Sequence, residues 1–95
     1  MIFCGIDPGS SGYIAIINDN GNIDFHPIPI IEKKIDSHKL LNILNQYKLD
    51  GILIEEQLNL PGRNLHVATR FTNYGMILCA INLSNHPFEI IKPRS

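Results

Sequence analysis

The sequence has no tryptophan, two cysteines and no apolar stretch that approaches the roughly 20 residues needed to span a membrane. A signal peptide is not expected either, because no basic segment precedes an uninterrupted apolar run. Cys4 and Cys79 form neither a disulfide framework nor a CxxC metal motif, and both lie within apolar runs. We therefore expect two reduced core thiols in a cytoplasmic protein.

An excess of positive charge is also missing, since 8 Lys and Arg residues face 9 Asp and Glu residues and the net charge is −1. The chain as a whole thus lacks the electrostatic signature of a nucleic-acid-binding protein, and any such binding would have to use local patches. No Ser/His/Asp or Cys/His arrangement is identifiable. The histidines have no zinc-ligand spacing, so no zinc site is predicted; they are His26, His38, His66 and His86.

The first third of the chain predicts a three-stranded antiparallel meander. Residues 2–7 form an apolar run that ends in an Asp-Pro-Gly turn signal. A second run at 13–17 is closed by Asn20-Gly21, a strong hairpin signal. Residues 23–28 then form the return strand, and the prolines at its end favour an edge position.

The rest of the chain alternates helices and strands. We expect a helix capped by Asp36 or Ser37 and a later helix whose apolar stripe includes Phe71 and Gly75. The order β-β-β-α-β-α-β predicts one α/β domain over residues 1–95, with a mixed sheet. Because the strands are apolar at consecutive positions, we expect helices on both faces of that sheet. The remaining elements are a helix to about residue 47, a strand at 51–55, a loop at 58–64, a helix at 65–83 and a strand at 88–91.

Carboxylates end two of the predicted strands. If the strands that end at Asp7 and Glu55 are parallel neighbours, both side chains emerge at the same edge of the sheet. Such a pair suits Mg²⁺ or Mn²⁺, which combine carboxylate oxygens with water and phosphate. An aspartate before Pro-Gly, as at Asp7, is equally typical of a simple turn. Glutamates such as Glu55 and Glu56 are equally typical of a strand end in contact with solvent. Alternation puts Glu55 and Glu56 on opposite faces, and periodicity alone does not decide which one joins Asp7.

Candidates for phosphate binding are few. The Gly5–Gly12 loop carries Ser10 and Ser11, whose hydroxyls and backbone N–H groups could contact a phosphate, although a simple hairpin is an alternative. Arg63 follows the acidic strand, where a phosphate would pass, and a solvated loop charge is its alternative. The other basic candidates are Arg70, Lys92 and Arg94.

Three segments together resemble the RuvC family of Holliday-junction resolvases, especially its shorter phage-type relatives. Residues 2–13, with the core Gly-Ile-Asp-Pro-Gly, resemble the first acidic motif of the family. Residues 54–57, Ile-Glu-Glu-Gln, followed by Gly-Arg-Asn at 62–64, resemble the second. Residues 88–94 resemble the strand and basic turn before the last segment of the family.

This resemblance implies a ribonuclease H-like fold and Mg²⁺-dependent incision of branched DNA by a homodimer, with Mn²⁺ as a substitute. It makes Asp7 and Glu55 the catalytic metal ligands. It also implies that the 65–83 helix packs against the twin subunit, which would give Gly75 a purpose. Leu58 stands where well-known members have an aromatic residue, so only an apolar wedge is expected there. The implied DNA contacts are Ser10, Ser11, Leu58, Arg63, Asn64, Lys92 and Arg94.

One departure from the family is larger. The family completes its metal site with acidic residues on a C-terminal helix, and no such helix follows Lys92 here. We therefore expect a C-terminally incomplete domain with little or no nuclease activity of its own. Two alternatives are a non-catalytic nucleic-acid-binding or assembly module and an actin-like nucleotide-binding fragment. A nuclease that processes ribosomal RNA precursors shares the first motif but fits residues 54–57 less well.

Overall fold

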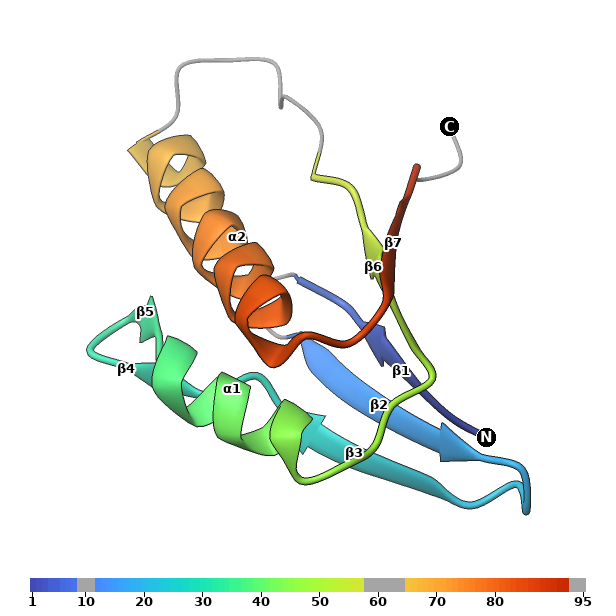
Figure 1. Ribbon diagram of the computed structural model, residues 1–95. Helices are drawn as coiled ribbons and strands as arrows, with labels where there is room; N and C mark the ends of the chain where they lie inside the picture. Colours follow the sequence, from blue (N-terminus) through green and yellow to red (C-terminus); the bar gives the residue numbers. More distant parts are fainter. Residues whose placement is uncertain (9–11, 58–64, 93–95) are drawn as a thin grey trace.

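A five-stranded mixed sheet is the centre of the fold. The computed structural model describes residues 1–8, 12–57 and 65–92. The sheet has the order β3-β2-β1-β6-β7, in which the first three strands are antiparallel and β6 and β7 run parallel to β1 (Figure 1). The predicted meander and mixed sheet are thus confirmed. The strands are β1 (Ile2–Ile6), β2 (Tyr13–Asn18), β3 (Ile23–Pro27), β6 (Gly51–Glu55) and β7 (Phe88–Ile91).

Two helices connect the later strands, α1 (Ser37–Asn45) and α2 (Leu65–Ser84). Asp36 caps α1 as predicted, because its carboxylate accepts a hydrogen bond of 3.0 Å from the backbone N–H of Lys39. A small hairpin of β4 (Ile30–Ile31) and β5 (Lys34–Ile35) precedes α1 and was not predicted. Its turn is Glu32-Lys33, which has none of the glycine or asparagine that marks a tight hairpin turn in a sequence.

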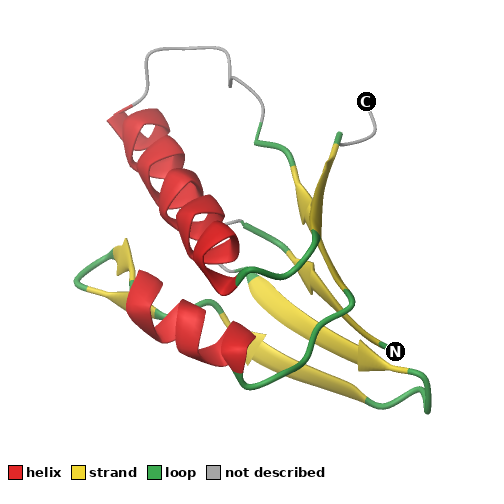
Figure 2. Ribbon diagram, viewed as in Figure 1, coloured by secondary structure: helices red, strands yellow, loops and turns green. Residues whose placement is uncertain are grey.

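The hydrophobic core lies between one face of the sheet and the two helices. Every second residue of the central strands is buried, such as Ile14 in β2 and Ile54 in β6, both with no exposed surface. These side chains belong to one cluster with Leu40 of α1 and Ile77 of α2. The two helices lie against each other over this same face (Figure 2).

The opposite face of the sheet is apolar and open. Phe3, Tyr13 and Leu53 point to it and are 43%, 54% and 45% exposed. The expectation of helices on both faces is therefore met on one face only in the part of the chain that the structure describes. The strands do carry consecutive apolar residues, but only every second one is buried under the helices. The apolar runs therefore supply both faces of the sheet, and helices pack against one of them.

Cys79 corrects the expectation of two core thiols. Cys4 is buried in β1, and burial raises the pKa of its thiol to about 12, whereas Cys79 is exposed on α2. The apolar stripe expected on α2 was also misplaced, because Phe71 and Gly75 are exposed while Ile77 and Ile81 are fully buried. Apolar residues surround much of this helix, so its sequence does not single out the face that packs against the sheet.

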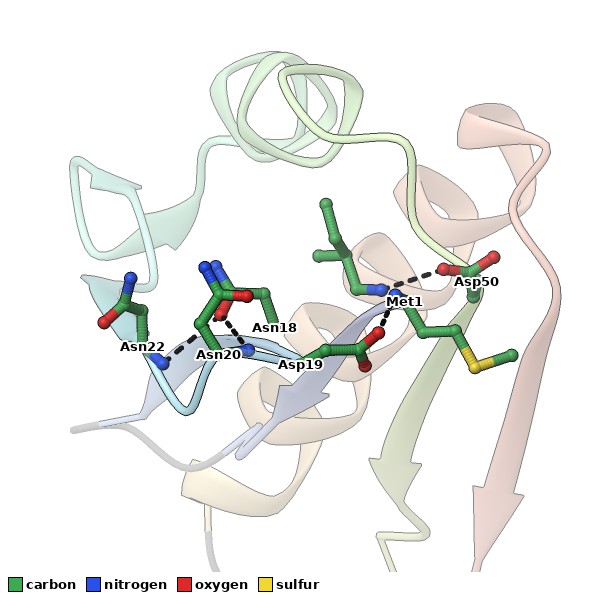
Figure 3. Close-up of polar contacts among 7 residues, drawn as sticks. Met1, Asn18, Asp19, Asn20, Asn22 and Asp50 are labelled. Carbon is green, nitrogen blue, oxygen red and sulfur yellow. Dashed lines mark hydrogen bonds and ion pairs between the residues drawn. The ribbon is translucent and has the colours of Figure 1, made fainter.

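Polar contacts fix the end of the sheet where β1 begins. The carboxylate of Asp50 accepts a hydrogen bond of 2.8 Å from the N–H of Ile2, and the N–H of Asp50 donates to the carbonyl of Ile2 at 2.8 Å. The amine of Met1 is 2.6 Å from Asp19, which raises the pKa of that amine (Figure 3). Asn18 closes the β2–β3 turn by accepting hydrogen bonds from the N–H groups of Asn20 and Asn22. This end therefore carries negative side chains.

The one-sided core predicts unequal effects of two neighbouring substitutions in β6. Ile52→Ala should lower the free energy of unfolding by about 2–5 kcal/mol, because Ile52 is 1% exposed and its removal leaves a cavity. Leu53→Ala, on the open face, should cost less than about 1 kcal/mol. Urea unfolding followed by circular dichroism measures both values. Equal losses for the two variants would mean that the second face is also packed.

Candidate metal centre

Parallel pairing of β1 with β6 brings the two predicted carboxylates together. The register pairs Ile6 with Ile54, so Asp7 and Glu55 follow at the same end of adjacent strands. The backbone of Asp7 is held by a hydrogen bond of 3.0 Å from its N–H to the carbonyl of Tyr13. Glu55 is the last residue of β6 and is paired with Ile91 of β7. Both residues thus stand on fixed backbone positions.

Asp7 and Glu55 also share a face of the sheet. Both line a hollow of about 500 Å³ on the open face, and both are exposed. The hollow exists because Gly5 and Ala15, which pair across β1 and β2, have little or no side chain. A Cβ at Gly5 would meet no atom within 4 Å. The two carboxylates therefore lie at the border of an accessible, largely apolar depression.

Glu56 faces the other way and does not join this pair. It is half-buried, and its N–H continues the pairing with β7 by donating to the carbonyl of Ile91 at 2.7 Å. The Tyr74 hydroxyl of α2 is shielded from solvent and lies near enough for the charge of Glu56 to affect its pKa. Burial raises the pKa of Tyr74, the backbone of Gln57 opposes the shift, and the charge of Glu56 adds to it. The alternation left open in the sequence is thus resolved in favour of Glu55 as the neighbour of Asp7.

The donor atoms at this place fit a hard divalent cation. Mg²⁺ binds through one or two carboxylates and keeps several waters or phosphate oxygens, so Asp7 and Glu55 on rigid strand ends are suitable ligands. Among residues 1–8, 12–57 and 65–92, no group of three or more His, Cys, Asp or Glu side chains comes together. Two carboxylates would hold one ion, while the two-ion arrangement of phosphodiester hydrolysis needs more ligands.

The other predicted site residues are only partly located. Lys92 directly follows β7 and is exposed; because β7 is parallel to β6, Lys92 lies at the same end of the sheet as Glu55. The remaining predicted DNA contacts lie outside the described residues; they are Ser10, Ser11, Leu58, Arg63, Asn64 and Arg94. Arg70 is exposed on α2.

Two aromatic residues of the hollow were not predicted. Tyr13 and Phe25 both line it, and they are 54% and 65% exposed. The register places Tyr13 opposite Pro27 and Phe25 opposite Ala15, so both lie on the face that carries Asp7 and Glu55. The alternation of Tyr13 with Ala15 was a usable signal, but the apolar run around Tyr13 obscured which residues share a face. Phe25 joins that face through its pairing with Ala15 across β2 and β3.

The fold is that of RuvC, as the resemblance implied. Similar solved structures include "T. thermophilus RuvC in complex with Holliday junction substrate", with a TM-score of 0.71, 16% identity, and coverage of 98% of this chain and 65% of that one. A second Thermus thermophilus RuvC structure has a TM-score of 0.62 and 17% identity, with 98% and 64% coverage. This chain spans less than two thirds of the length of both. No protein-family model and no curated protein matches the sequence.

The paired carboxylates predict a specific pattern of Mn²⁺ binding. Asp7→Asn and Glu55→Gln should each weaken Mn²⁺ binding at least about tenfold. Losses of that size are typical even for residues that hydrogen-bond to a metal ligand without touching the metal. Glu56→Gln is the matched control, since it removes the adjacent carboxylate on the opposite face, and it should bind as the parent chain does. Isothermal titration calorimetry measures the three variants. Equal weakening by Glu56→Gln would contradict the assignment.

Proposed function

We propose that this chain belongs to a structure-selective DNA endonuclease of the Holliday-junction resolvase type. The observation that carries the proposal is the pair Asp7 and Glu55, which lie side by side at the ends of parallel strands and face one accessible hollow. It is supported by the similarity of the fold to a RuvC structure in complex with a Holliday junction substrate. The proposed reaction is hydrolysis of a phosphodiester bond in branched DNA.

In this proposal Asp7 and Glu55 hold Mg²⁺, for which Mn²⁺ can substitute. A bound ion of this kind supplies activation of a water molecule and stabilisation of negative charge on the phosphate and leaving oxygen. The strand ends keep both carboxylates at fixed positions, which reduces the entropy lost when the ligand set assembles. Lys92, at the same end of the sheet, is placed to contact a neighbouring phosphate of the DNA backbone.

The 95 residues alone are proposed to have little or no nuclease activity. Two carboxylates leave a second ion without enough protein ligands, and the hollow beside them is open on the apolar face. A complete protein would supply further acidic ligands and cover that face. A cover would also remove exposed apolar area around Phe3, Tyr13 and Leu53, which favours its docking there.

The test is cleavage of a four-way DNA junction in Mn²⁺ by the complete protein and by residues 1–95. The complete protein should cleave, Asp7→Asn should reduce its cleavage to background because a metal ligand is lost, and Glu56→Gln should retain cleavage. Residues 1–95 should give only background cleavage. Full cleavage by the Asp7→Asn variant would overturn the proposed chemistry, and junction binding without cleavage by the complete protein would identify a non-catalytic binding module.

We further propose that α2 pairs with α2 of a second copy in a homodimer. Four residues spaced four apart lie on its exposed side: Phe71, Gly75, Cys79 and Leu83. Phe71 is 38% and Leu83 61% exposed, and the smaller Gly75 and Cys79 lie between them. Small residues allow two helix backbones to approach closely while larger apolar residues pack on either side. The glycine in the middle of a helix, which costs about 1 kcal/mol relative to alanine, is explained by such a contact.

Gly75→Leu separates dimerisation from folding. A Cβ at Gly75 meets no atom within 4 Å of the same chain, so the variant should fold with unchanged or slightly higher stability. The added side chain should hold the two helices apart and convert the dimer to a monomer in sedimentation-velocity ultracentrifugation. Lys48→Leu, in the connection between α1 and β6, is the control for a newly exposed leucine and should remain dimeric. A dimeric Gly75→Leu variant would exclude α2 as the interface.

A further inference from the structure

The β4–β5 hairpin projects from the end of the sheet that carries the candidate metal centre. β3 ends at Pro27, which pairs with Tyr13, and the carbonyl of Tyr13 holds the backbone of Asp7. The next residue, Ile28, donates a hydrogen bond of 3.2 Å to the carbonyl of Gly12. The hairpin thus leaves the sheet beside the segment that follows Asp7. Its base is closed by a hydrogen bond of 2.9 Å from the N–H of Asp36 to the carbonyl of Pro29.

The hairpin is held to the rest of the molecule through Ile35, while Ile30, its cross-strand partner on the same face, is 53% exposed. Ile35 is buried, and its N–H donates to the side-chain oxygen of Asn73 on α2 at 3.3 Å. Ile31 pairs with Lys34 across the hairpin, next to the pair of Ile30 and Ile35. The side chains of Ile31 and Lys34 therefore point to the face of the hairpin opposite to Ile35. Ile31 is 59% exposed and Lys34 is exposed. An aliphatic and a cationic side chain therefore lie side by side on a firmly held ribbon.

The turn of this hairpin adds a second cation in a strained backbone position. Glu32 and Lys33 have φ values of 51° and 65°, in the left-handed region that non-glycine residues rarely adopt. The β2–β3 turn of the same chain uses Gly21 at its positive φ of 83°. A lysine thus occupies a place where glycine or asparagine would be favoured locally, and its ammonium group stands at the exposed tip.

Three lysines gather in the hairpin and the start of α1. Lys33, Lys34 and Lys39 lie in the hairpin and the first turn of α1, and none forms a salt bridge in the described residues. Glu32 and Asp36 are the carboxylates of the same segment, and Asp36 is engaged as the cap of α1. Asp7 and Glu55 lie at the same end of the sheet, on its open face. The opposite end of the sheet carries negative side chains, namely Asp19, Asp24 and Asp50. A polyanion is therefore attracted to this local group of lysines rather than to a whole end of the sheet.

We propose that the β4–β5 hairpin is a second DNA contact, separate from the two carboxylates. Lys33 and Lys34 bind backbone phosphates of one arm of a branched DNA, and Ile31 packs against the sugars or base edges between them. The inference rests on the proposed endonuclease function, because it assumes that branched DNA approaches this end of the sheet. An exposed isoleucine alone would suit a protein partner as well, but the lysines beside Ile31, which form no salt bridge with the residues described, favour a nucleic acid.

The salt dependence of junction binding tests the inference. The probe is a fluorescein-labelled four-way DNA junction without divalent metal, and the readout is anisotropy over a series of salt concentrations with the 95-residue chain. Lys33→Gln and Lys34→Gln should each weaken binding several-fold and lower the slope of log K against log salt by about 1, as expected for one lost phosphate contact. Ile31→Ser should weaken binding without changing the slope. The matched control Lys48→Gln should leave both unchanged.

Each contrary outcome is distinguishable from failure of the proposed nuclease function. Junction binding by the parent chain with unchanged slopes in both lysine variants would overturn the hairpin contact and leave the carboxylate chemistry intact. No junction binding by the parent chain, alongside junction cleavage by the complete protein, would overturn the hairpin contact and not the nuclease function. A change in sedimentation coefficient with unaltered DNA affinity would identify the hairpin as a protein contact instead. Because the assay contains no divalent metal, it measures DNA binding alone and does not depend on cleavage.

Discussion

Parallel pairing between β1 and β6 is the constraint on which the candidate site depends. The register that pairs Ile6 with Ile54 places Asp7 and Glu55 at one end of neighbouring strands and on one face. A shift of one residue would move Glu56 to that face and turn Glu55 towards the helices. The core opposes such a shift, because Ile52 and Ile54 would leave the buried cluster. Apolar packing on one side of the sheet thus fixes the carboxylates on the other side.

One face of the sheet is packed against helices, and the other is open. One face binds α1 and α2 and supplies the core, while the other keeps an apolar surface around the hollow at Gly5 and Ala15. The hairpin end of the sheet carries both lysines and the Asp7/Glu55 pair, while the start of β1 carries aspartates. A net charge of −1 does not reveal this local grouping of lysines.

Much of the fold followed from local sequence signals. The Asn20-Gly21 turn, the Asp36 cap and the Asp-Pro-Gly end of the first strand each predicted an element or boundary that the structure contains. Two features could not be predicted, because each depends on tertiary packing. The Glu32-Lys33 turn has no glycine, and the buried face of α2 cannot be chosen from an apolar helix. Periodicity alone could not choose between Glu55 and Glu56; the family resemblance favoured Glu55, which the register places on the face of Asp7. Cys79 was expected in the core because the apolar residues of α2 do not reveal which side of the helix is buried.

Asp7 and Glu55 are proposed to bind one divalent cation together. The most direct measurement is anomalous diffraction at the manganese absorption edge from crystals of the chain soaked in Mn²⁺. An anomalous peak is expected within about 2–2.5 Å of carboxylate oxygens of both residues, the range of metal–oxygen bonds for hard cations. A peak near Glu56, or one at the aspartates beside the start of β1 with none at Asp7, would contradict it.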